Sequence, residues 1–180
     1  AQTNVLCSGN STGSATASAT GGTSGYSYSW NSSPVQATAT ASNLPAGIYS
    51  CTISDANGCT TTVNATITQP ASSLSASLGA QTNVTCFGNS TGSATVNASG
   101  GTGTISYSWN TTPVQTTATA TGLTAGSYTC TVKDASNCTV IVNATITQPA
   151  AALDANITAQ TNVLCFGNAT GSATVSVSGG

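Results

Sequence analysis

Charged side chains are almost absent from this chain of 180 residues, and histidine, arginine and methionine do not occur at all. The charged residues are Lys133, Asp55, Asp134 and Asp154. One cation cannot neutralise a run of phosphates, which excludes nucleic-acid binding through the phosphate backbone. No apolar run approaches the roughly 18 residues of a transmembrane helix, so we expect no membrane insertion. Three scattered carboxylates without histidine offer no calcium cage, and we predict neither a metal site nor a cofactor.

A tandem repeat is the strongest positive signal. AQTNVLC begins at Ala1, AQTNVTC at Ala80 and AQTNVLC again at Ala159, which gives a period of 79 residues. We therefore expect one repeat at 1–79, with a linker segment at about 70–82, a second at 80–158, and the first strands of a truncated third at 159–180. The linker is either flexible or an added strand. We interpret the chain as part of a longer exported polypeptide.

Enzymatic activity is not expected. A serine nucleophile needs a base, and the only lysine, Lys133, has Ser54 as its counterpart in the first repeat. Asp55 and Asp134 are equivalent turn residues one period apart, so they do not form a carboxylate pair for acid–base chemistry. Their expected role is to form turns by bonding the local backbone.

Apolar and polar residues alternate strictly in several short segments of each repeat. Tyr26, Tyr28 and Trp30, for example, alternate with serines. This period of two predicts half-buried strands, and Gly, Asn, Asp and Pro clusters between them predict turns. In the first repeat the expected strands lie at about 14–20, 26–30, 36–41, 48–55 and 61–68. Six or seven short strands in about 80 residues predict an all-β chain of tandem immunoglobulin-like β-sandwich repeats.

Four aromatic residues are predicted to belong to the sandwich cores. Trp30 and Trp109 fall on the third strand, where such sandwiches often bury a tryptophan. Tyr49 and Tyr128 follow a glycine-containing turn and precede a cysteine by two residues, which is the spacing of a tyrosine corner. The alternative, a platform on which carbohydrate stacks, requires these rings on an exposed face.

Seven cysteines follow the same period, which favours disulfides and an extracellular, cell-surface or secreted location. Zinc is disfavoured because histidine is absent and the spacing does not fit a zinc knuckle. The disulfide candidates are Cys7, Cys51, Cys59, Cys86, Cys130, Cys138 and Cys165. Three cysteines per repeat leave one over. The strand pattern allows Cys7 to pair with Cys51, which frees Cys59 to link a neighbouring repeat or chain. The spare cysteine is otherwise a buried apolar thiol.

Sequons of the form Asn-x-Ser/Thr are dense, although Asn and Thr are abundant enough to create many by chance. The candidate glycan acceptors are Asn31, Asn64, Asn97, Asn110 and Asn143. Asn64, Asn97 and Asn143 fall on the outward side of their expected strands, as an acceptor must. O-glycosylation of the Ser/Thr-rich surface is an equal alternative.

The ordered motifs VxCxGNSTGSAT, GGT, SYSWN, ATATxL, AGxYxCTxxDAxxC and VNATITQP resemble the SprB repeat of Bacteroidota cell-surface proteins. That family is named for a very large gliding-motility adhesin exported by the type IX secretion system. The resemblance implies a filamentous surface protein built from many tandem sandwiches. It also implies the pairings Cys7–Cys59 and Cys86–Cys138, because those two positions typify the family. Cys51 and Cys130 depart from the family pattern, which usually has a small strand-forming residue there.

Two functions follow from these observations. The first is the non-enzymatic structural shaft of an extracellular bacterial surface filament or adhesin, in which neighbouring repeats are the main partners and surface glycans or carbohydrates are contacted with avidity. The second is a self-assembling extracellular fibre or sheath, in which copies pack laterally or exchange strands.

Overall fold

The computed structural model describes residues 1–180, which form fourteen β-strands joined by turns and loops. No helix long and apolar enough to cross a membrane is present. The chain divides into two compact units. The first comprises Ala1–Ala76, Ala98–Ser106 and Val132–Val140, and the second comprises Ser77–Asn97, Tyr107–Thr131 and Ile141–Gly180. The first unit thus contains nearly all of the first repeat together with two segments of the second.

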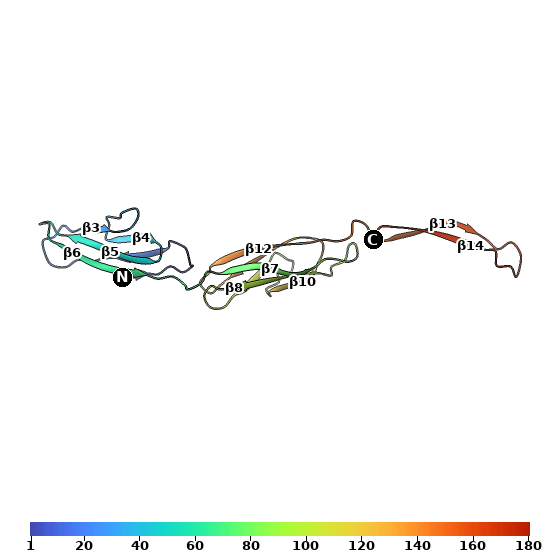
Figure 1. Ribbon diagram of the computed structural model, residues 1–180, viewed down its shortest axis with the longest axis horizontal. Coiled ribbons are helices and arrows are strands. Elements are labelled where there is room, and N and C mark those ends of the chain that lie inside the picture. The colour runs from blue at the N-terminus through green and yellow to red at the C-terminus, as the bar shows by residue number, and fades with distance from the viewer. The chain divides into compact units, whose positions relative to one another are not determined.

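The first repeat is a sandwich of two three-stranded antiparallel sheets. Its strands are β1 (Gln2–Thr3), β2 (Gly13–Thr16), β3 (Ser27–Trp30), β4 (Thr40–Leu44), β5 (Gly47–Ser54) and β6 (Thr60–Ile67). One sheet has the order β1-β2-β4 and the other β3-β5-β6, and Figure 1 shows the latter strands side by side. In the second sheet Trp30 lies opposite Cys51, and Cys51 lies opposite Val63. This all-β, immunoglobulin-like architecture confirms the predicted fold class.

The core of the first sandwich combines one large aromatic side chain with many small residues. The Trp30 side chain is 2% exposed, and Cys51 and Ala41 are fully buried. The alanines let the two sheets approach closely, so the tryptophan fills much of the space between them. The buried cluster consists of Val5, Ala15, Ala17, Trp30, Ala41, Leu44, Tyr49, Cys51, Ile53 and Ile67.

The second repeat has the same two sheets, with the orders β10-β8-β7 and β12-β11-β9. The strands are β7 (Ser75–Thr82), β8 (Gly92–Ser99), β9 (Ser106–Trp109), β10 (Thr119–Leu123), β11 (Gly126–Lys133) and β12 (Thr139–Ile146). Most of the expected linker at 70–82 is therefore strand β7, which pairs with β8 and opens the second sandwich. Pairing satisfies backbone groups that a flexible linker would leave to water.

A third, shorter element follows the second sandwich. Strands β13 (Asp154–Thr161) and β14 (Ser172–Ser178) form an antiparallel hairpin. Its register runs from Asp154 opposite Ser178 to Thr161 opposite Ser172. These strands are the counterparts of β7 and β8, as the sequence period requires.

Two predicted strands differ from the structure. The strand expected at 14–20 ends early, because β2 covers only Gly13–Thr16. The alternation at 36–41 predicts a strand, but β4 begins only at Thr40. The backbone carbonyl of Gln36 accepts a hydrogen bond from the Trp30 backbone N–H, and the carbonyl of Thr38 accepts one from the Trp30 indole. The Gln36 side chain then holds Ser42 through two hydrogen bonds of 2.9 Å. The segment therefore supports the tryptophan instead of extending the sheet.

Val63 is another departure, because the alternation places it inward but its side chain is 38% exposed. Its counterpart Val142 is only 8% exposed. The facing strand has two residues in the first repeat (β1) and eight in the second (β7), so the facing sheet covers less of Val63.

Candidate functional site

The candidate site is a joint where the loop that carries Cys7 meets a turn of the second repeat, all within the first compact unit. The Cys7 loop is tied to the end of β6. Val5 N–H donates to the Thr68 carbonyl at 2.9 Å, and Gly9 N–H donates to Gln69 Oε1 at 2.9 Å. The Asn10 N–H closes the loop on the Cys7 carbonyl at 3.1 Å. These bonds fix Cys7 beside the point where the chain leaves β6.

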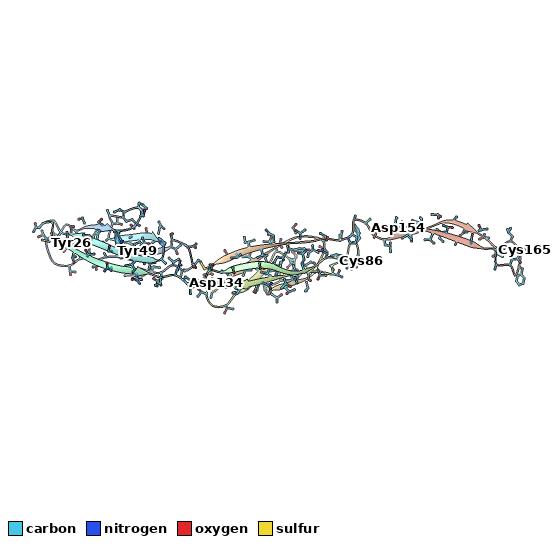
Figure 2. The ribbon with its side chains drawn as sticks, viewed as in Figure 1. Tyr26, Tyr49, Cys86, Asp134, Asp154 and Cys165 are labelled. Carbon is cyan, nitrogen blue, oxygen red and sulfur yellow. A yellow bond between two sulfur atoms is a disulfide. The ribbon has the colours of Figure 1, made fainter.

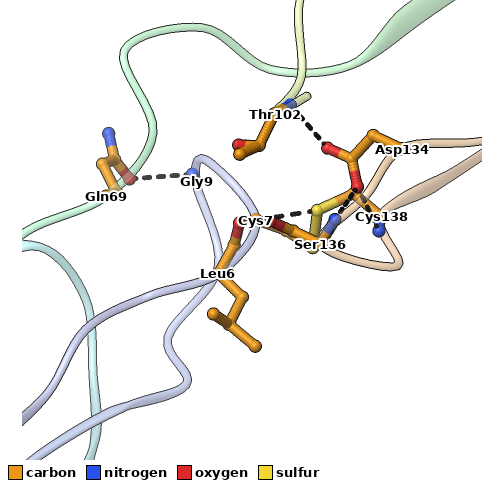
Figure 3. Close-up of a disulfide and its surroundings, with 8 residues drawn as sticks. All are labelled: Leu6, Cys7, Gly9, Gln69, Thr102, Asp134, Ser136 and Cys138. Atoms are coloured by element: carbon orange, nitrogen blue, oxygen red, sulfur yellow. Dashed lines mark hydrogen bonds between the residues drawn. A yellow bond between two sulfur atoms is a disulfide. The ribbon is translucent and has the colours of Figure 1, made fainter. Parts of the chain in front are cut away.

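The partner turn is organised by one carboxylate. Asp134 Oδ1 accepts the backbone N–H groups of Ser136 and Cys138, each at 2.9 Å, and Oδ2 accepts that of Thr102 at 2.9 Å (Figure 3). Gly101 allows this arrangement, because its φ is +71° and an added Cβ would lie 2.8 Å from Asp134 Oδ2. The GGT and DAxxC motifs are thus two halves of one structure.

Asp134 is only 4% exposed, yet its hydrogen bonds make its carboxyl more acidic than an ordinary aspartate. Burial alone would raise the pKa of this carboxyl, but the N–H groups of Thr102, Cys138 and Ser136 outweigh burial, so the pKa is lowered. In the first repeat the pKa of Asp55 is lowered as well, chiefly by the backbone N–H groups of Thr23 and Cys59. The structure gives both aspartates the predicted turn-forming geometry.

A disulfide joins Cys7 to Cys138, with their Cα atoms 5.6 Å apart. The Cys138 sulfur also lies 3.6 Å from the carbonyl oxygen of Leu6 (Figure 3). A hollow of about 300 Å³ beside the disulfide is lined by residues of both repeats, among them Pro70 and Leu74 from the first and Gly101 from the second. The bond therefore links the end of the first sandwich from which the chain leaves β6 to a turn of the second sandwich just before β12.

This pairing corrects the expectation of Cys7–Cys59 and Cys86–Cys138 bonds. Cys7 lies at the end of β6, next to Thr68 and Gln69, whereas Cys59 immediately precedes the first residue of that strand. A strand of eight residues spans roughly 26 Å, and disulfide-bonded Cα atoms lie within about 7 Å. A bond inside the repeat would need the two ends of β6 to meet.

The Cys7–Cys51 alternative fails for a similar reason. Cys51 sits in the middle of β5, opposite Val63, and its side chain is fully buried in the core. Cys130 is its equivalent in the second repeat and is also fully buried. Burial raises the pKa of both thiols, although a backbone hydrogen bond partly opposes the effect. These two cysteines are apolar core residues.

The remaining cysteines are exposed and unpaired. They are Cys59, Cys86 and Cys165, the last two of which are labelled in Figure 2. No group of three or more His, Cys, Asp or Glu side chains is arranged to hold a metal ion.

The four aromatic candidates all make backbone hydrogen bonds through their polar atoms. The indole N–H of Trp30 donates to Thr38 and that of Trp109 to Thr117, each at 3.0 Å. The Tyr49 hydroxyl donates to the Pro45 carbonyl at 3.0 Å, which is the bond of a tyrosine corner. Tyr128 bonds Thr124 in the same way at 3.1 Å. Trp30, Trp109 and Tyr49 are buried, and Tyr128 is half-buried.

The asparagine candidates differ in how their side chains are used. Asn31 Oδ1 accepts the Ser50 N–H at 2.9 Å, and Asn110 Oδ1 accepts the Thr129 N–H at 2.8 Å, so both brace a neighbouring strand. Asn64, Asn97 and Asn143 are exposed on strands β6, β8 and β12. Glycosylation of all five stays a prediction.

Sequence reasoning missed the residues that position the disulfide, namely Gly9, Gln69, Gly101 and Thr102. The sequence carries no signal for them, because the contact that places Cys7 is tertiary. Strand β6 (Thr60–Ile67) separates Cys59 from Gln69, and the hydrogen bond from Gly9 to Gln69 places the Cys7 loop at the far end of that strand.

A protein-family model for the SprB repeat matches residues 1–35, 78–113 and 157–180, which together cover more than half of the chain. The chain belongs to the SprB repeat family. Each matched segment begins near the first strand of an SprB repeat and includes its first cysteine, Cys7, Cys86 or Cys165. No curated protein matches the chain.

Two solved structures are similar to this chain of SprB repeats. One contains three N-terminal domains of the bacteriophage RB49 highly immunogenic outer capsid protein, with 16% identity and a TM-score of 0.38. The match covers 98% of this chain and 66% of that one. The other contains the eight N-terminal immunoglobulin domains of a Down syndrome cell adhesion molecule isoform, with 16% identity and a TM-score of 0.30, covering 86% of this chain and 26% of that one.

Proposed function

We propose that the chain is a segment of the structural shaft of an extracellular bacterial surface filament or adhesin, with no catalytic role. The observation that supports this proposal most directly is the Cys7–Cys138 disulfide, which joins successive repeats covalently. Disulfides persist in oxidising surroundings such as the cell surface, and a shaft benefits from bonds that do not depend on a large core. Membership of the SprB repeat family agrees with a surface location.

The role proposed for the disulfide is to carry tension along the shaft. Residues 8–137 lie between the two bonded cysteines, so a pull on the ends of the chain passes through the disulfide and bypasses most of both sandwiches, apart from β1 and β12. The thin alanine-rich cores then carry less of the load than they would in an unlinked array. The main binding partners in this proposal are the neighbouring repeats of the same chain. Weak contacts with surface carbohydrates along the shaft add up by avidity. Export by type IX secretion and glycosylation at the exposed asparagines belong to the same proposal.

The test is the location and size of the native polypeptide. An antibody against residues 1–180 should label intact cells, and external protease should remove the label. On a denaturing gel the labelled species should be very large with and without reductant, as one giant chain requires. Labelling only after the cells are opened would contradict the proposal. Short chains after reduction would support the self-assembling fibre instead, in which exposed thiols such as Cys59 and Cys86 join separate copies.

A further inference from the structure

Two cysteine-bearing elements recur in the repeats. The first-cysteine loop is residues 4–10 in the first repeat and 83–89 in the second. The third-cysteine turn is residues 55–59 in the first repeat and 134–138 in the second. The disulfide joins the first-cysteine loop of the first repeat to the third-cysteine turn of the second. In the first two repeats, one example of each element therefore remains without a disulfide, carrying Cys86 and Cys59, and the third copy adds the unpaired first-cysteine loop of Cys165.

The unpaired first-cysteine loop has the same internal bonds as the paired one. Gly88 N–H donates to Gln148 Oε1 at 2.9 Å, and Val84 N–H donates to the Thr147 carbonyl at 2.9 Å. Asn89 N–H closes the loop on the Cys86 carbonyl at 3.2 Å. Each bond has its counterpart in the loop of Cys7, so the loop is built by its own repeat and does not require the disulfide.

The unpaired third-cysteine turn is also complete. Asp55 Oδ1 accepts the N–H groups of Asn57 at 3.0 Å and Cys59 at 2.9 Å, and Oδ2 accepts that of Thr23 at 3.0 Å. These bonds match those that Asp134 makes at Cys138. Cys59 borders a hollow of about 170 Å³ that also includes Gly22. The turn that holds the bonded Cys138 is thus reproduced around Cys59, with Gly22 and Asp55 in the places of Gly101 and Asp134.

We propose that Cys59 and Cys86 are halves of the same inter-repeat bond, with Cys59 taking the first cysteine of a preceding SprB repeat and Cys86 the third cysteine of a following one. In a longer array every pair of successive repeats is then joined by one disulfide. The partner is a repeat of this same type. The assignment rests on the equivalence of preformed elements and not on the proposed function.

This inference accounts for the odd number of cysteines per repeat. The first cysteine bonds forward, the third bonds backward, and the second, Cys51 or Cys130, stays in the core as a thiol. Each new bond forms by thiol–disulfide exchange. One cysteine thiolate attacks a small disulfide such as oxidised glutathione, which releases one small thiol and leaves a mixed disulfide. The second cysteine thiolate then attacks the protein sulfur of the mixed disulfide and releases the other small thiol, so two protein thiols and one small disulfide become one protein disulfide and two small thiols.

The bonds also overlap along the chain. The segment from Cys138 to Cys165 connects the Cys7–Cys138 bond to the next bond, which Cys165 forms. The segment from Cys59 to Cys86 likewise connects the bond that Cys59 forms with the preceding repeat to the bond that Cys86 forms with the following one. Tension in such an array passes along two interleaved covalent paths. Each path runs through the disulfides and the short segments that connect them. Most of each sandwich lies outside these segments and is therefore protected from forced unfolding.

The test is an in-phase fusion in which residues 1–158 precede the complete chain, because Ala159 is equivalent to Ala1. In the second copy, Thr60→Ser and Thr85→Ser change the masses of the peptides that carry Cys59 and Cys86, so that the copies can be told apart. The fusion is oxidised in a glutathione buffer, its monomer is isolated, and its disulfides are mapped by peptide mass spectrometry without reduction. The expected map contains the Cys7–Cys138 bond in each copy and one new bond, between Cys86 of the first copy and Cys59 of the second.

Three results would overturn the proposal. These are a Cys86–Cys138 bond within a repeat, a Cys59–Cys86 bond between separate polypeptides, and full alkylation of Cys86 in the first copy and Cys59 in the second. A matched variant carries Cys86→Ser in the first copy only. It should leave Cys59 of the second copy open to alkylation while the Cys7–Cys138 bonds remain. Loss of those bonds in this variant would count against the assignment, because it would show scrambling in place of defined partners.

Discussion

Cys7 of the first repeat is bonded to Cys138 of the second, and neither repeat contains a disulfide of its own. The relationship follows from which end of β6, or of its equivalent β12, each cysteine lies beside. The loop of Cys7 is hydrogen-bonded to Gln69, just after β6 ends, and Cys138 stands just before β12 begins. One end of a repeat therefore presents a first cysteine, and the opposite end presents a third cysteine.

Removing this bond should lower the stability of the chain. The double variant Cys7→Ser/Cys138→Ser loses a cross-link that closes a sequence separation of 131 residues. For loops of this length we expect a loss of roughly 2–5 kcal/mol in the free energy of unfolding, measured with guanidinium. Cys86→Ser is the matched control, since Cys86 is exposed and unpaired. Equal stability of the double variant and this control would show that the bond does not stabilise the fold.

Reduction should lengthen the chain that force can extract. With the disulfide closed, the 131 positions from Cys7 to Cys138 cannot extend when the termini are pulled. Reduction should release roughly 430–470 Å of additional contour length, at about 3.3–3.6 Å per residue. Single-molecule force spectroscopy with and without reductant measures this difference. The Cys7→Ser variant should give the longer value under both conditions, and an unchanged contour length in the native chain would contradict the bond.

Thiol reactivity should divide the five free cysteines into two classes. Cys51 and Cys130 are fully buried, and burial raises the pKa of their thiols, so less of the reactive thiolate forms. In the folded chain, an alkylating reagent should rapidly modify the three exposed cysteines, which are Cys59, Cys86 and Cys165. Mass spectrometry then counts the modified thiols. Cys51 and Cys130 should react only after unfolding. Alkylation of Cys51 at the rate of Cys59 would show that the core opens readily.

The sequence was a good guide wherever a local pattern decides the structure. Period-two alternation located β3, β5 and β6 within one or two residues, and the spacing before Cys51 indicated a tyrosine corner, which the hydrogen bond from Tyr49 to Pro45 forms. It failed where the backbone serves a distant group, as at Gln36, whose carbonyl and side chain are used by Trp30 and Ser42. Such demands come from tertiary contacts and leave no periodic trace.

The disulfide pairing was wrong for a different reason. Counting cysteines within one repeat assumes that partners lie in the same fold unit. In a tandem array, the neighbouring repeat brings an equivalent cysteine at a fixed position, and Cys138 reaches Cys7 where Cys59 does not. The pairing depends on how one repeat follows the next, which the pattern inside a single repeat does not contain.

Acid should destabilise the chain through the turn aspartates. The hydrogen bonds from Thr102, Cys138 and Ser136 overcome burial and hold the pKa of Asp134 below the value of about 3.9 expected for an unfolded aspartate. The pKa of Asp55 is lowered too. The unfolded chain then binds protons first as the pH falls. The contribution of these carboxylates is therefore complete above about pH 4 and is lost as the pH drops through their folded pKa values.

We expect the free energy of unfolding to be nearly constant between about pH 7 and 5 and to decline below about pH 4. The variants Asp55→Asn and Asp134→Asn should be less stable at neutral pH, because an amide NH₂ cannot accept the N–H of Thr23 or Thr102 that Oδ2 now accepts. They should also show a shallower decline in acid. Asp154→Asn is the matched control, since Asp154 bonds only the side chain of Asn156 on the exposed hairpin. A decline in Asp134→Asn as steep as that in the control would mean that other groups cause the loss of stability in acid.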